Sequence, residues 1–216
     1  MSLKKHLAHL CLTSALTFTS VTFAQEAPSS LLSLQHQWAK VNYEYEDETK
    51  LTALHQLIAD AEVLSQQTHH SAEALTWLAI SQSSTASAKG GLGALKYAQS
   101  AKENLEKAIE QDEAVLEGTA LTVLAALYHK VPGWPVSFGS DKKAHSLFTR
   151  ALEINPTGMD QNFFYAEFLF DEGEQEKALS HLSIAASAPQ KPNRPLADMK
   201  RREEIKALQD AITKRR

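Results

Sequence analysis

The chain has 216 residues, of which 43% are hydrophobic, and a formal net charge of −4. This acidic balance gives no reason to expect nucleic acid as a partner, because binding to phosphates requires a basic surface. The single cysteine excludes a framework of disulfides within the chain.

The first 24 residues have the layout of a secretory signal peptide. Lys4 and Lys5 precede an apolar run over residues 7–24, and the chain turns polar at Gln25. A positive start, a short apolar stretch and a small residue at the cleavage position are typical of such signals. We therefore expect an exported, periplasmic protein whose mature chain begins at Gln25. Its formal net charge would be −6, since the two lysines are the only charged side chains removed.

A retained transmembrane anchor is the alternative interpretation of this segment. The apolar run has only 18 residues and contains His9, whereas a spanning helix needs about 20 predominantly apolar residues. Lipid attachment at Cys11 is disfavoured, because lipoprotein signals place a small residue directly before the cysteine and Leu10 stands there. No later apolar run is long enough to cross a membrane.

The rest of the chain, residues 25–216, predicts a single all-α domain. Alternating β-branched runs are missing, while Ala, Leu, Glu, Lys and Gln dominate, and these residues favour helices. Glycine and proline mark the breaks between helices. The predicted helices are residues 31–44, 48–67, 71–88, 92–112, 114–130, 141–154, 160–172, 174–187 and 196–213.

Three of these helices share a spacing of small, large and small residues, which is typical of the second helix of a tetratricopeptide unit. Alanine lets paired helices approach closely, and the large residue fills the groove between them. The three sets are Ala101, Leu105, Ala108; Ala144, Phe148, Ala151; and Ala178, Leu182, Ala185. We therefore predict stacked tetratricopeptide-like pairs, an α-solenoid, with units at about 72–113, 116–156 and 159–190 and a C-terminal helix at 196–213. A generic helical bundle is the alternative.

The first two units have extra residues between their paired helices. Nine positions separate Leu169 from Ala178 in the third unit, whereas the equivalent separations are seventeen and sixteen in the first and second. We predict loop insertions at both places. The second insertion, residues 131–139, contains Trp134 and Phe138 among prolines and glycines, which make a loop stiff. Two interpretations of Trp134 remain open: it packs between helix pairs, or it lines a ligand site.

The first helices of such units line the inner face of the stack, and helix geometry selects the residues on that face. In the third unit they are Asp160, Phe163, Glu167 and Phe170; in the second Thr119, Thr122, Ala126 and His129; in the first Leu75, Leu78, Gln82 and Thr85. An apolar wall with a few polar points is typical of a small-molecule site, and Trp134 and Phe138 are placed to roof it. For Phe163, a place in the ordinary core is the alternative.

Several of these stretches resemble the TatT family, the tetratricopeptide T-component of TRAP-type transport systems. The most specific are Pro-Gly-Trp-Pro at 132–135 and Asn-Phe-Phe-Tyr at 162–165, and the similarity covers about residues 35–210. These two lie within longer matches at 131–139 and 158–165, and the remaining matches are residues 93–98, 188–189 and 194–198. The resemblance implies a homotrimeric periplasmic protein that partners a solute-binding protein of a TRAP transporter, with a ligand-accessible channel through each subunit; the apolar inner face described above favours a small apolar ligand. The resemblance also suggests Arg194 as a basic contact.

The chain has no spacing that predicts catalysis or a metal site. His69 and His70 are adjacent, and neither His-Glu-x-x-His, Cys-x-x-Cys nor Gly-x-Ser-x-Gly occurs. The charges around Arg201 and Glu204 predict a solvated helix face with local salt bridges. We therefore expect a binding or scaffolding protein, not an enzyme, with no cofactor. The alternative function is a general envelope protein–protein interaction module without a transport role.

Overall fold

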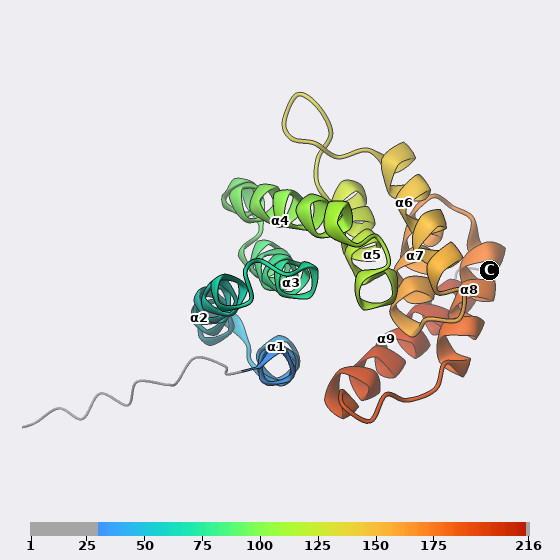
Figure 1. Cartoon of the computed structure of the whole chain (residues 1–216). Helices are drawn as coiled ribbons and strands as arrows, with labels where there is room; N and C mark the ends of the chain where they lie inside the picture. The colour runs from blue at the N-terminus through green and yellow to red at the C-terminus, as the bar shows by residue number, and fades with distance from the viewer. Residues whose placement is uncertain (1–29, 215–216) are drawn as a thin grey trace, which may run out of the picture.

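A computed structural model describes residues 30–214, which form nine α-helices and no strand (Figure 1). The predicted signal peptide, residues 1–24, lies outside the described residues. The helices are α1 (Leu31–Glu44), α2 (Asp47–Gln67), α3 (Ala72–Lys89), α4 (Gly91–Gln111), α5 (Val115–Lys130), α6 (Asp141–Ile154), α7 (Met159–Asp171), α8 (Gln175–Ser187) and α9 (Pro195–Lys214). Every boundary lies within one residue of the prediction, and the all-α fold is confirmed.

The odd-numbered helices form a closed inner ring. Helix α1 contacts α3, α3 contacts α5, α5 contacts α7, α7 contacts α9, and α9 returns to contact α1 (Figure 1). The even-numbered helices pack outside this ring, each between two of its members. Neighbouring helices therefore pack in pairs, as a helical repeat requires. The contact between α9 and α1 was not predicted. His36 of α1 also forms a hydrogen bond of 2.8 Å, through Nε2, with the carbonyl of Asn193 in the connection before α9.

The patterned alanines lie where the helices of a pair come closest. All nine residues of the three small–large–small sets are at most 1% exposed. Gly118 is also close to the partner helix, since a Cβ there would lie 3.5 Å from the Cα of Ala151. Close backbone approach is therefore the reason for small residues at these positions.

The predicted loop insertion in the first unit is wrong, whereas the second is a loop. The extra residues of the first unit extend α3 to 18 residues and α4 to 21, with Gly90 alone between them at φ 63°.

The second insertion forms the loop over residues 131–140. Its backbone bonds to itself, since the amides of Val136 and Ser137 donate to the carbonyl of Gly133. A side chain at Gly139 would collide with the carbonyl of Val131. Hydrogen bonds within the loop and close packing at Gly139 therefore constrain its backbone.

No helix among residues 30–214 is long and apolar enough to span a membrane.

The packing of α5 on α6 predicts how substitutions in α6 change stability. Ala144 and Ala151 are fully buried, so replacing either with leucine should overpack the contact and lower the free energy of unfolding by about 1–3 kcal/mol. Phe148→Ala should cost about 3–5 kcal/mol because its ring is buried. Chemical denaturation would measure these values. Ser146→Leu, an exposed change on the same helix, is the matched control and should stay within about 0.5 kcal/mol of wild type.

Candidate functional site

The inner ring encloses a groove of about 1130 Å³. Small side chains on the facing helices leave this space unfilled. Helix α3 contributes Ser83, Ser84 and Ser87, while Ala98 of α4 and Ala126 of α5 form part of the opposite walls. The volume slightly exceeds the roughly 300–1000 Å³ that small-molecule sites usually have. The groove is therefore large enough for an elongated ligand.

The groove wall is mainly apolar, and its aromatic residues come from α1 and α7. Trp38 packs edge-on against Trp77 and Tyr43, with ring centroids 5.7 and 5.8 Å apart respectively. Its indole N–H donates to the Ser84 hydroxyl over 2.8 Å, so neither polar group faces the groove without a partner. Other apolar lining residues are Ile80, Leu95, Val123, Phe163 and Leu208.

In the described part of the chain, four charged residues line the groove: Lys130, Glu167, Arg201 and Glu204. Arg201 is the most deeply buried of the cations, with 7% of its surface exposed. Its Nε donates to Asp160 over 2.9 Å and one terminal nitrogen donates to Glu204 over 2.7 Å.

The guanidinium group of Arg201 also lies over the rings of Phe163 and Phe164, 4.4 and 4.5 Å from their centroids. Cation–π contact of this kind stabilises a cation that water does not reach. The charge of Arg201 is therefore stabilised on every side, by two carboxylates and by two aromatic rings.

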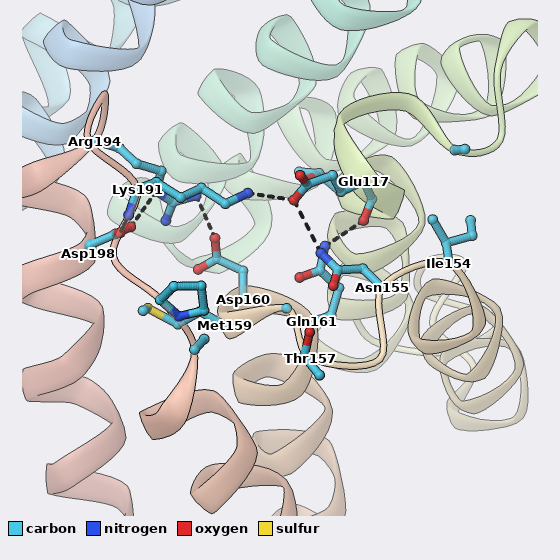
Figure 2. A pocket seen from close by; sticks show the side chains of 15 residues that line it. Glu117, Ile154, Asn155, Thr157, Met159, Asp160, Gln161, Lys191, Arg194 and Asp198 are labelled. Carbon is cyan, nitrogen blue, oxygen red and sulfur yellow. Dashed lines mark hydrogen bonds and ion pairs between the residues drawn. The ribbon is translucent and has the colours of Figure 1, made fainter.

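A second, polar cleft of about 550 Å³ lies at the start of α7, where the connections before α5, α7 and α9 meet (Figure 2). Asp160 faces it and binds Arg194, with 2.8 Å between Asp160 Oδ2 and a terminal nitrogen of Arg194. Arg194 Nε lies 2.6 Å from Oδ1 of Asp198, whose side chain is 3% exposed. Lys191 binds Glu117 across the mouth of the cleft.

Asp160 therefore pairs with two arginines, and this pairing sets its ionisation. Burial alone would raise the pKa of Asp160, but the charges of Arg201 and Arg194 and their hydrogen bonds lower it to about 2. The same carboxylate, with Glu204, raises the pKa of Arg201 above its ordinary value despite burial. The cluster is thus an internal ion-pair network that remains charged at neutral pH.

A left-handed turn at the start of α5 forms one edge of the polar cleft. Leu116, Glu117 and Gly118 have φ angles of 49°, 59° and 77°. A left-handed conformation costs about 1–2 kcal/mol per non-glycine residue. The side-chain amide of Gln161 donates to the carbonyl of Glu117 over 2.7 Å, and the Thr119 hydroxyl donates to that of Leu116 over 2.6 Å. These bonds offset the strain and attach the turn to α7.

The structure divides the predicted site residues among several places. The groove is lined by Phe163, Glu167 and Ala126, which were predicted from their positions on the inner face of their helices. Phe163 is also part of the core. Asp160 and Arg194 lie together in the polar cleft instead. Phe170 is half-buried against the core and is not among the residues that line the groove.

His129 and the loop residues also lie away from the groove. His129 contacts Asp141 over 2.8 Å and Asp171 over 2.9 Å, so it links α5, α6 and α7. Phe138 packs edge-on against Tyr128, with centroids 5.4 Å apart. Trp134 is 90% exposed, so the prediction that it roofs the inner face is wrong, and it does not pack between helix pairs either.

Sequence reasoning missed Arg201 and the aromatic residues of α1. The prediction that Arg201 belongs to a solvated face is wrong. A usable signal was present, because Asp198, Arg201, Ile205 and Ile212 recur at helical spacing and share the buried stripe of α9. Trp38 and Tyr43 precede the three units, so the counting of inner-face positions did not include them.

A scan against models of protein families and a search of curated proteins found no match for this chain. Among residues 30–214, no three His, Cys, Asp or Glu side chains are grouped so that they could hold a metal ion.

The low pKa of Asp160 predicts a dependence of stability on pH. The folded state favours the carboxylate, so this stabilisation is complete above the ordinary pKa of 3.8 and is lost as the pH falls through about 2. The difference in free energy of unfolding between wild type and Asp160→Asn should therefore shrink by about 2 kcal/mol between pH of about 5 and about 2. Denaturant titrations across this range would measure it.

Asp210→Asn is the matched control, because Asp210 is exposed and, within residues 30–214, pairs only with Lys206 on the same helix. It should change stability by less than about 0.5 kcal/mol throughout. A difference between wild type and Asp160→Asn that stays constant with pH would contradict the role assigned to Asp160.

Proposed function

We propose that this protein is an exported helical-repeat binding component of a TRAP-type uptake system. In this proposal it holds a small, largely apolar ligand in its central groove and binds a periplasmic solute-binding protein. The resemblance described above supplies the transport system, the partner and a homotrimeric assembly. The groove supplies the physical reason for a ligand.

The observation that carries the proposal is the size and lining of the groove. A protein interior normally has few voids larger than a water molecule, yet the centre of this ring is about 1130 Å³ of open space with largely apolar walls. Ser83 and Ala126 face this space where larger residues could have filled it. An unfilled apolar site with a few polar groups is the usual form of a small-molecule site.

The loop over residues 131–140 supports contact with a protein partner. Trp134 and Val136 are 90% and 56% exposed on a loop that is stiffened by its own hydrogen bonds and by Phe138 beneath it. Exposed tryptophans at preorganised positions are the residues that most often dominate the energy of protein–protein binding. Trp134 is thus a contact for the solute-binding protein, not part of the ligand site.

Narrowing the groove should weaken binding of an apolar ligand. Ala126→Trp places an indole in the groove, so the affinity for the neutral fluorescent probe N-phenyl-1-naphthylamine should fall about tenfold, equivalent to about 1.4 kcal/mol. Fluorescence titration would measure it, with circular dichroism to confirm folding. The matched control is Ala59→Trp on the exposed face of α2. If wild type does not bind the probe, or both variants bind equally, the groove is not the ligand site.

Removing the exposed indole should weaken binding of the partner alone. Trp134→Ala should lower the affinity for the solute-binding protein of the host's TRAP system by at least about 30-fold, the loss of about 2 kcal/mol typical of a hot spot. Calorimetry would measure it, and Leu32→Ala, another exposed apolar residue, is the control. Unchanged partner affinity would rule out this contact. If this protein binds the solute-binding protein but does not bind the fluorescent probe, the result would favour the alternative function, an interaction module without a transport role.

A further inference from the structure

The charges that line the groove suggest which class of ligand it selects, an inference that rests on the proposed function. Among the described residues, four charged side chains line the groove, two cationic and two anionic. A ligand head group will be attracted by whichever of these charges the protein itself leaves unpaired, because paired charges gain little from a second partner.

Both cations already hold carboxylates. Arg201 binds Asp160 and Glu204 at 2.9 and 2.7 Å, and these two carboxylates balance its charge. The ammonium group of Lys130 lies 2.7 Å from Oδ2 of Asp171, at the end of α7. Glu204 is therefore also occupied, and one anion remains.

That remaining anion is Glu167, which lines the groove one helical turn after Phe163. Within residues 30–214 it forms no ion pair or hydrogen bond within bonding distance. Its side chain is half-buried, and burial is the main reason that its pKa is raised, while Lys130 and Arg201 partly oppose this effect from further away. A half-buried carboxyl group without a partner is costly, and a ligand that supplies one would remove that cost.

We propose that the groove selects amphiphiles with a positively charged amine head, which Glu167 binds while the aliphatic body lies along the apolar wall. Leu95, Ala98 and Val123 provide that wall on α4 and α5. The amine pairs with the one charged lining residue, among residues 30–214, that lacks an ion pair, and it leaves the existing ion pairs intact.

An anionic head is disfavoured for the same reason. A carboxylate in the groove would be repelled by Glu167 and Glu204, and the two cations that residues 30–214 place there already hold carboxylates. A neutral hydroxyl head can hydrogen-bond to Glu167 but brings no opposite charge, so it should bind less tightly than the amine.

The test compares three ligands of equal chain length: decylamine, decanol and decanoate. Each displaces N-phenyl-1-naphthylamine from the wild-type protein at neutral pH, and the apparent Kd is determined by titration. We expect decylamine to bind at least about tenfold more tightly than decanol, and decanoate to bind least tightly. Glu167→Gln should reduce the affinity for decylamine to that for decanol and leave the affinity for decanol unchanged.

Glu172→Gln, an exposed position at the end of α7, is the matched control and should not alter any of the three affinities. If decanol or decanoate binds wild type as tightly as decylamine, or if Glu167→Gln keeps the preference for the amine, the head-group inference is overturned while the groove remains a ligand site. If neither the fluorescent probe nor any of the three ligands binds wild type, the proposed function itself fails.

Discussion

Arg201 carries its charge into the interior of the helical ring, and the position of the last helix depends on how that charge is neutralised. Removing one partner of a buried ion pair costs about 3–5 kcal/mol, because the other charge is left without compensation. Asp160 provides that partner from the first turn of α7, where the helix dipole also favours a negative charge. The same carboxylate binds Arg194 just before α9. The pair of Asp160 and Arg201 thus fixes α9 on α7 and forms the boundary between the polar cleft and the groove.

Small residues have opposite effects on the two sides of the helices. On the outer contacts, Ala101 and Ala108 bring paired helices so close that no space remains. On the inner side, small residues face the centre of the ring, where no helix fills the space, and their size keeps the groove open. Helix α3 also limits its own polarity, since the hydroxyls of Thr76, Ser81 and Thr85 donate to backbone carbonyls one turn earlier. Of the α3 serines that line the groove, Ser84 accepts the indole N–H of Trp38, whereas the buried hydroxyl of Ser83 has no hydrogen-bond partner among residues 30–214.

Local spacing predicted the helices and their pairing, whereas the site depends on contacts that spacing does not record. Glycine and proline mark each break between helices. The set Ala144, Phe148 and Ala151 reflects the close approach of two helices, so the sequence alone predicts both the breaks and the pairing. The count of extra residues before Ala101 was correct, but it could not distinguish a loop from two longer helices. The burial of Arg201 depends on Asp160, 41 residues away, and charged residues are exposed by default. The prediction for Trp134 was wrong for the converse reason. Large aromatic residues are usually buried, but this one is exposed.

The contact between α1 and α9 changes how the fold should unfold. In an open stack of helical repeats, stability is a sum over nearest neighbours, and the terminal units fray first because each has a neighbour on one side only. Here the first helix packs against α2, α3 and α9, and the last against α7, α8 and α1. Neither end can detach without also breaking the contact that joins the ends, so backbone amides in both should exchange with solvent mainly through a concerted opening. The closure also limits the number of repeats, because an inserted helix pair would move α9 away from α1.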